Sequence, residues 1–147
     1  MFEKNQENEI DALRDECKRL LPEFRKWLVD KRLSDKVINN HVSNVEFYLD
    51  PFLINRDVKS AAEGVEEIGY FLGYWFISKA AWASRTSIKS NIASLKKFYQ
   101  FMLQRGEISA AAYDDMKERI KEEKDAWLAT VERYDDPDVD INDIWGF

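Results

Sequence analysis

The sequence predicts an all-α protein, an orthogonal bundle of four to five helices with an extra C-terminal helix and an acidic tail. Only 5 glycines and 3 prolines occur among 147 residues, so the chain contains few natural breaks. The polar–apolar alternation typical of strands is missing, and apolar residues recur at helical spacing instead. Because 45% of the residues are hydrophobic, the chain can bury one core without disulfides. We expect one domain over residues 1–134 and the tail over residues 135–147.

The first predicted helix is defined by an apolar stripe that runs from Ile10 to Leu28. Pro22 lies inside this stripe, so we expect a kink or a restart there. Cys17 occupies a stripe position, which favours core packing over the alternatives of a reactive thiol or an intermolecular bridge.

The second predicted helix covers residues 35–49, with Ser34 as its N-cap and Pro51 as its stop. His41 falls on its apolar side and is the only histidine in the sequence. We therefore expect this ring to be packed in the core. The opposite face of the helix is polar and comprises Lys36, Asn39, Asn40, Ser43 and Glu46.

The third predicted helix is the most aromatic part of the chain. Ser60 and Glu63 have the spacing of a capping box at its start, and we expect the helix to continue to about Ser78. Aromatic residues surround it on nearly every side, which is typical of a central, buried helix. These residues are Tyr70, Phe71, Tyr74, Trp75 and Phe76.

The fourth predicted helix begins at a cap, Ser84 or Thr86, and ends near Gly106, a residue type favoured at helix C-termini. The fifth begins at Ser109 and carries apolar residues to Tyr134 on one side and mixed charges on the other. The polar side of the fourth helix consists of Thr86, Lys89, Ser90, Lys96, Lys97 and Gln100.

Charge is segregated along the chain, although the net charge is only −6. Residues 68–106 contain six basic residues and no Asp or Glu, while the rest of the chain holds 16 basic and 28 acidic residues. The overall acidity argues against a protein that coats nucleic acid by bulk charge. The acid-free stretch instead indicates one local surface suited to a negatively charged partner.

The residues needed for catalysis or metal binding are not gathered anywhere in the sequence. A zinc or iron site requires three or four ligands, which one His and one Cys cannot supply. The carboxylates of residues 114–124 interleave with basic residues, as on an ion-paired helix surface. We therefore expect no enzyme activity, metal, cofactor or small-molecule ligand. Because no apolar run has the length of a membrane span or signal peptide, we expect a cytoplasmic protein without membrane contact.

The polar faces of the second and fourth predicted helices are suited to approaching double-stranded DNA. Lysines contact phosphates, while short hydroxyl and amide side chains let the backbone come close and donate hydrogen bonds. An ordinary solvated helix face is the alternative interpretation of the same residues. The predicted DNA-binding residues are Lys36, Asn39, Asn40, Ser43, Arg85, Thr86, Lys89, Ser90, Lys96, Lys97 and Gln100.

Several segments resemble a known family when they are taken in order. Residues 24–28, Phe-Arg-Lys-Trp-Leu, precede residues 33–41, Leu-Ser-Asp-Lys-Val-Ile-Asn-Asn-His. Residues 93–101, Ala-Ser-Leu-Lys-Lys-Phe-Tyr-Gln-Phe, are followed by Gly-Glu-Ile at 106–108. This arrangement is similar to the N-terminal core-binding domain of tyrosine recombinases and phage integrases over roughly residues 20–108. The resemblance implies a SAM-like bundle of four or five helices that clamps a DNA duplex with its second and fourth helices.

The chain also departs from that family. His41 stands where the family usually has Tyr, and Glu46 and Asp50 make the second helix less basic than in DNA-binding members. Ser109 opens a further helix where the family has an Asn-Pro linker into a catalytic domain. The family's catalytic set of paired Arg, Lys, His and a nucleophilic Tyr has no counterpart here. The resemblance thus implies a non-catalytic module: a solo domain, a truncated recombinase product or a relative with another use.

Two functions remain open at this point. The first is a DNA-binding module tied to integration or recombination of a mobile element, which the acid-free fourth helix favours. The second is a protein-interaction domain that keeps the fold without DNA binding, with itself or a recombinase-like protein as partner. The acidic composition and charged fifth helix favour the second. Trp145 and Phe147 are the predicted partner-binding residues of the tail, which has two alternatives: folding back on its own domain or remaining disordered.

Overall fold

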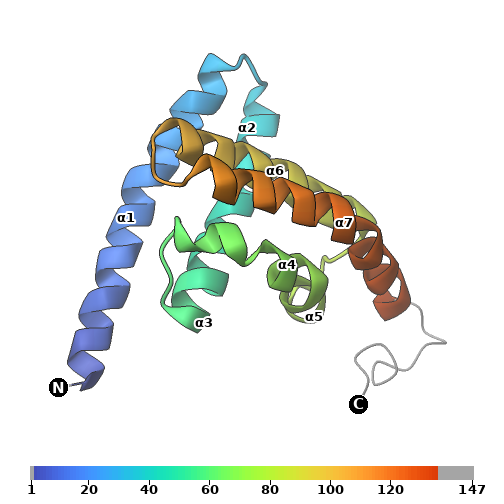
Figure 1. Cartoon of the computed structure of the whole chain (residues 1–147), viewed down its shortest axis with the longest axis horizontal. Helices are drawn as coiled ribbons and strands as arrows, with labels where there is room; N and C mark the ends of the chain where they lie inside the picture. The colour runs from blue at the N-terminus through green and yellow to red at the C-terminus, as the bar shows by residue number, and fades with distance from the viewer. Residues whose placement is uncertain (1, 136–147) are drawn as a thin grey trace.

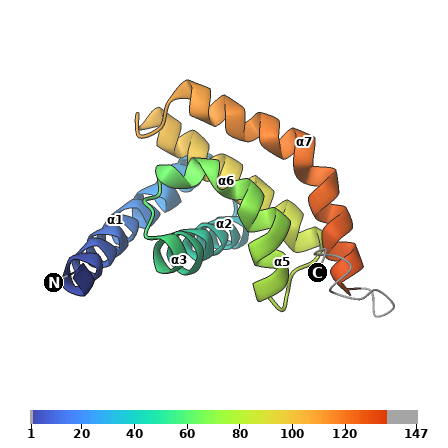
Figure 2. The ribbon, with the colours of Figure 1, turned by 60° about the horizontal axis from the view of Figure 1, so that its bottom comes forward.

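The computed structural model describes residues 2–135, and every regular element within that range is helical. The prediction of an all-α helical bundle is therefore confirmed. Shorter helical segments connect α2 to α6, and α6 and α7 lie side by side in both ribbon views (Figures 1 and 2). The long helices of this range are α1 (Phe2–Asp30), α2 (Asp35–Phe47), α6 (Arg85–Gln104) and α7 (Ala110–Asp135).

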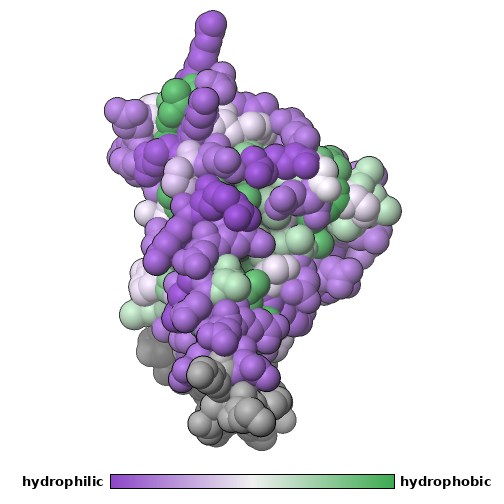
Figure 3. Space-filling model, turned by 90° about the vertical axis from the view of Figure 1, so that its left-hand side faces the viewer, coloured by the Kyte–Doolittle hydropathy of each residue, from purple (hydrophilic) through white to green (hydrophobic). Residues whose placement is uncertain are grey.

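Helix α1 places its apolar stripe in the core and its remaining surface in solvent. Leu20, Phe24 and Leu28 are fully buried, and the side of the molecule where α1 lies is largely hydrophilic (Figure 3). Burial raises the pKa of the Cys17 thiol to about 12, with the Glu16 carboxylate adding to the effect, which favours packing over reactivity. The expected restart at Pro22 is wrong, since α1 is one helix through this residue. Pro22 is exposed, so water can bond the carbonyl that it leaves unpaired.

Helix α2 begins as predicted but does not stop at Pro51. The Ser34 Oγ accepts a hydrogen bond from the Val37 amide at 3.3 Å and caps the helix. A π-helical segment, η1 (Tyr48–Ile54), then carries the chain through Pro51 into α3 (Asn55–Asp57). A wider turn accommodates a proline, which lacks an N–H and crowds the preceding turn. Burial of the flanking side chains holds this segment in place; these are Tyr48, Leu49, Phe52, Leu53 and Ile54.

The third predicted helix is broken. Ser60 and Glu63 form the expected capping box, with the Ser60 amide 3.0 Å from Glu63 Oε1 and the Glu63 amide 3.2 Å from Ser60 Oγ. Glu67 then leaves helical geometry, with φ −102° and ψ 0°. The resulting segments are η2 (Glu63–Glu66), α4 (Ile68–Tyr70), η3 (Phe71–Trp75) and α5 (Phe76–Lys79).

Two tyrosines from distant helices hold the start of this broken helix. The Tyr48 hydroxyl donates to the Gly64 carbonyl at 2.5 Å, and the Tyr99 hydroxyl donates to the Ala61 carbonyl at 2.8 Å. Burial raises the pKa of both phenols well above its usual value, so both are neutral donors. A Cβ at Gly64 would lie 2.5 Å from the Tyr99 hydroxyl and closer still to Leu53. Only glycine therefore fits where these side chains meet.

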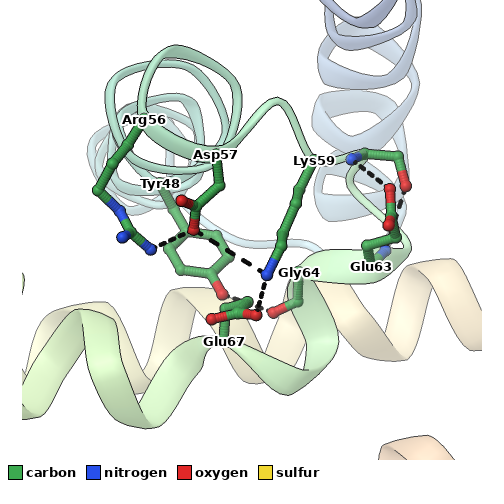
Figure 4. Close-up of polar contacts among 8 residues, drawn as sticks. Tyr48, Arg56, Asp57, Lys59, Glu63, Gly64 and Glu67 are labelled. Carbon is green, nitrogen blue, oxygen red and sulfur yellow. Dashed lines mark hydrogen bonds and ion pairs between the residues drawn. The ribbon is translucent and has the colours of Figure 1, made fainter.

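A chain of ion pairs surrounds this contact (Figure 4). Arg56 pairs with Asp57, Lys59 bridges Asp57 and Glu67, and the hydrogen bond to Glu67 raises the pKa of Lys59. We call residues 56–67 together with Tyr48 and Tyr99 the 56–67 junction. Its two tyrosine hydroxyls tie η1 and α6 to η2 and the residue Ala61 just before it.

The aromatic segment 70–76 is not buried all round, contrary to the prediction. Phe71 and Phe76 are buried, but Tyr70 is 44% exposed and Tyr74 is 36% exposed. The two tyrosine rings stack with centroids 5.2 Å apart. The segment η3 is π-helical, and its turn differs from that of an α-helix. Its side chains therefore point in other directions than those of the single uniform α-helix that the sequence predicted.

The caps of α6 and α7 match the sequence. Ser84, rather than Thr86, is the N-cap of α6, and it forms a reciprocal capping box with Ser87. Gly106 ends the helix with φ +75°, and the Glu107 amide bonds the Met102 carbonyl as in a Schellman motif. Buried residues on the core side of α7 are Met116, Ile120, Trp127, Leu128 and Val131.

Candidate nucleic-acid interface

A groove of about 920 Å³ lies between α2 and the N-terminal half of α6, and we call it the α2–α6 groove. Its lining within the described chain contains no carboxylate. The lining residues are Lys36, Val37, Asn39, Asn40, Ser43, Asn44, Trp82, Ser84, Thr86, Ser87, Ser90 and Asn91. Six of them were predicted from the sequence to bind DNA, namely Lys36, Asn39, Asn40, Ser43, Thr86 and Ser90.

A seam of amide and hydroxyl groups joins the two helices along the groove. The Asn40 Nδ2 donates to Ser90 Oγ at 2.9 Å, and the Asn44 Nδ2 lies 3.0 Å from the hydroxyl oxygens of both Ser90 and Ser94. These bonds fix the spacing of α2 and α6. Asn40 and Ser90 therefore help to build the groove, in addition to lining it.

His41 lies beneath this seam. Its Nδ1 is 2.7 Å from Ser94 Oγ, and that hydroxyl donates to the Ser90 carbonyl at 3.0 Å, so the histidine Nδ1 is assigned as a donor. Burial lowers the pKa of His41, and the nearby Lys97 ammonium adds to the effect. The ring is 6% exposed and neutral. The prediction of a packed, hydrogen-bonded core histidine is confirmed.

The predicted basic residues divide into two groups. Lys89 and Lys96 project from α6 as exposed side chains and have no ion-pair partner among residues 5–134, while Lys97 is half-buried. Arg85 instead pairs with Glu132 of α7 at 3.1 Å. Its charge is thus partly neutralised within the protein, which the sequence did not predict.

The remaining predicted residues lie away from the groove or have other contacts. Gln100 is half-buried farther along α6 and does not line the groove. Asn39 accepts a hydrogen bond from the Arg25 guanidinium at 2.8 Å, which brings an exposed cation of α1 to the edge of the groove. Arg25 was not predicted as a site residue, although it lies within residues 24–28, on which the family resemblance partly rests.

Two further groove residues were not predicted from the sequence. Trp82 is 59% exposed and lies in the connection between α5 and α6. Asn91 is 3% exposed, and its Oδ1 has no hydrogen-bond partner. A tryptophan among the small residues of the short connection 80–84 was the available signal for the first. For Asn91 the sequence provided no signal, because helical spacing placed this residue near the core side of α6.

Other predicted sites lie outside this region. Trp145 and Phe147 are outside the described residues. Within the described part of the chain, no group of three or more His, Cys, Asp or Glu side chains is placed to hold a metal ion. None of the described helices offers a stretch long and apolar enough to cross a bilayer.

No family model, curated protein or solved structure matches this chain. The resemblance to recombinase core-binding domains therefore remains a prediction from the sequence.

Proposed function

We propose that the protein is a non-catalytic DNA-binding module, similar to a recombinase core-binding domain and tied to integration or recombination of a mobile element. The observation that carries this proposal is the α2–α6 groove, whose lining combines amides, hydroxyls and Lys36 without a carboxylate. Such groups donate hydrogen bonds to phosphate and sugar oxygens of a duplex. Helix α6 carries further lysines outside the groove, of which Lys89 and Lys96 are exposed.

Charge sets the expected strength of binding. Four lysines remain for phosphate contacts, because Arg85 is paired with Glu132. Four contacts correspond to a slope of about −3.6 for the logarithm of the binding constant against the logarithm of salt concentration. The acidic remainder of the chain repels DNA, but salt screens charges beyond about 8 Å at physiological ionic strength. We expect affinity in the micromolar range, as for largely non-specific binding. The four lysines are Lys36, Lys89, Lys96 and Lys97.

A charge-reversal experiment tests this function. Fluorescence anisotropy of a labelled duplex would be measured at about 50 mM and about 150 mM salt, where counterion release predicts clearly weaker binding at the higher concentration. Lys89→Glu with Lys96→Glu is expected to abolish binding. Lys18→Glu with Lys121→Glu is the matched control, since it changes the net charge equally at exposed positions of α1 and α7. Absence of binding by the unmodified protein at low salt, or equal loss in both variants, would show that this surface does not bind DNA.

A second candidate is a protein-interaction domain that keeps the fold without DNA binding. The pairing of Arg85 with Glu132 favours it, because a basic residue of the predicted interface is already neutralised. Exposed Tyr70 and Tyr74 offer an aromatic surface that suits a protein partner, including a second copy of this chain. Sedimentation velocity over a concentration series separates the two candidates. Self-association that Tyr70→Ser weakens, together with no DNA binding, would support the second.

A further inference from the structure

Trp82 is the most exposed of the large hydrophobic side chains in the described residues, at 59%. The other tryptophans of that range, at 27, 75 and 127, are buried or half-buried. An exposed indole at the edge of a groove loses the stabilisation that burial would provide. Such a ring suits a ligand contact, because aromatic side chains supply a flat, rigid surface for stacking.

The indole is held in place by contacts with the rest of the protein. Its ring packs at steep angles against Phe47 and Phe76, with centroids 5.3 Å and 6.2 Å away. The Ser87 hydroxyl lies 3.2 Å from the Trp82 carbonyl, and Ser87 itself belongs to the capping box of α6. The first turn of α6 therefore orders the connection that presents Trp82. A ring held in this way loses little freedom when a ligand stacks on it.

Asn91 also lines the groove, and its side chain carries a buried hydrogen-bond acceptor without a partner among the described residues. Its Nδ2 donates to the Ser87 carbonyl at 2.9 Å. This bond orients the amide, so that Oδ1 points away from the Ser87 carbonyl. Among the described side chains, Asn91 Oδ1 is the one buried nitrogen or oxygen atom without a partner. Buried acceptors are nearly always satisfied in folded proteins, so this oxygen suits a donor supplied by a ligand.

The N-terminus of α6 adds a feature that suits phosphate. Ser84, Thr86 and Ser87 line the groove at the first turn of this 20-residue helix, where backbone N–H groups and the helix dipole favour an anion. The Thr86 hydroxyl there is an additional donor, whereas the hydroxyls of Ser84 and Ser87 donate within the protein. The groove thus offers a flat aromatic ring, a hydrogen-bond acceptor and an anion-favouring helix end.

We infer that the α2–α6 groove accommodates one unpaired nucleobase of DNA, which stacks on Trp82 and donates an N–H to Asn91 Oδ1, with its phosphate at the first turn of α6. This inference rests on the proposed DNA-binding function and deepens it. It predicts that the module prefers DNA containing an unpaired base over a fully paired duplex. Stacking on an aromatic residue tolerates any base, because every base has a flat π surface.

Three labelled DNA probes that differ at one position test this inference by fluorescence anisotropy. The first is a perfect duplex, the second carries one bulged base, and the third carries an abasic site in place of the bulged base. The third probe keeps the backbone distortion and removes only the base. We expect the unmodified protein to bind the bulged base more tightly than either other probe.

Variants assign the preference to the groove. Trp82→Leu is expected to weaken binding to the bulged base by about 5- to 100-fold, a larger loss than it causes for the perfect duplex. Trp82→Phe should restore part of the preference because it keeps a flat ring, and Asn91→Leu should reduce it. Tyr70→Leu is the matched control, an exposed aromatic side chain outside the groove.

The outcomes separate this inference from the proposed function. Binding to none of the probes contradicts the proposed function itself. Equal binding of the bulged and abasic probes, with the lysine charge reversals still abolishing binding, overturns the nucleobase site and leaves DNA binding intact. The comparison of probes uses the unmodified protein, so it remains decisive even if a variant does not fold.

Discussion

The 56–67 junction and the α2–α6 groove are both polar contacts between helices distant in sequence, but they use their polar groups differently. In the junction, both buried tyrosine hydroxyls donate to backbone carbonyls, and Lys59 bridges two carboxylates. In the groove, Asn91 Oδ1 has no partner and Trp82 is exposed. A polar region whose groups satisfy one another stabilises the fold, whereas one with an unused acceptor beside an exposed ring is suited to a ligand. Four predictions test this contrast.

Gly64→Ala should have the largest effect, because the added methyl group would collide with Leu53 and the Tyr99 hydroxyl. Such overpacking is expected to lower the free energy of unfolding by about 3 kcal/mol. Urea denaturation monitored by circular dichroism measures this value. Gly69→Ala is the control, because its methyl group would meet the flexible side chains of Arg119 and Glu123 at 3.2 Å. Equal stability of Gly64→Ala and the unmodified protein would contradict the proposed packing at the junction.

Tyr99→Phe should have the next largest effect. The substitution keeps the ring and removes the hydroxyl that bonds the Ala61 carbonyl at 2.8 Å. The carbonyl then stays buried without this donor, at a cost of about 1–2 kcal/mol. Chemical denaturation should show this loss while DNA binding is retained, since Tyr99 does not line the groove. Tyr113→Phe, on α7 and half-buried, is the control. A loss of DNA binding by the folded Tyr99→Phe protein would mean that the two regions are not independent.

The stability of the helix seam should depend on pH through His41. Burial lowers the pKa of His41 in the folded protein. At pH values between this lowered pKa and about 6.5, the unfolded chain therefore binds more protons than the folded protein does. Stability should therefore fall as pH decreases from about 6.5, by less than about 1.4 kcal/mol per pH unit. His41→Gln should show a weaker pH dependence between about pH 5.5 and 7.5, where other side chains titrate little. Identical urea midpoints for both proteins across this window would contradict the prediction.

Glu132→Gln should have the smallest effect on stability, within about 0.5 kcal/mol, because its ion pair with Arg85 is exposed. It should nevertheless strengthen DNA binding, because Arg85 then becomes available for a further phosphate. One more contact makes the salt slope steeper by about 0.9. Anisotropy titrations at several salt concentrations measure the slope. Glu122→Gln, an exposed carboxylate elsewhere on α7, is the control for net charge, and an equal change in both variants would exclude a specific role for the pair.

The long helices could be predicted from the sequence because their signals are local. Apolar spacing and caps such as Ser34, Ser84 and Gly106 act within one or two turns, and the structure agrees with each of them. The segments around Pro51 and Glu67 could not be predicted. There the helical geometry changes under the influence of side chains from other helices, such as Tyr48 and Tyr99, whose proximity the sequence does not reveal.

The candidate site could be predicted only in part, because the sequence reveals the faces of single helices but not the contacts between helices. The polar faces of two helices were visible as periodic patterns, so six of the predicted residues line the groove. The ion pair of Arg85 with Glu132 and the hydrogen bond from Arg25 to Asn39 join residues 47 and 14 positions apart. Pairing over such distances depends on how helices cross, and no periodicity within one helix encodes it.

By itself, the sequence determined that the chain is helical, where α2, α6 and α7 begin, and that one stretch lacks acidic residues. These properties follow from backbone preferences and spacing within single segments. Only the tertiary structure decided that α2 and α6 form a groove, that Asn91 keeps an unused acceptor there and that Trp82 is exposed at its edge. Burial and hydrogen-bond satisfaction depend on which side chains the packed helices bring together, and this is known only once the helices have been placed.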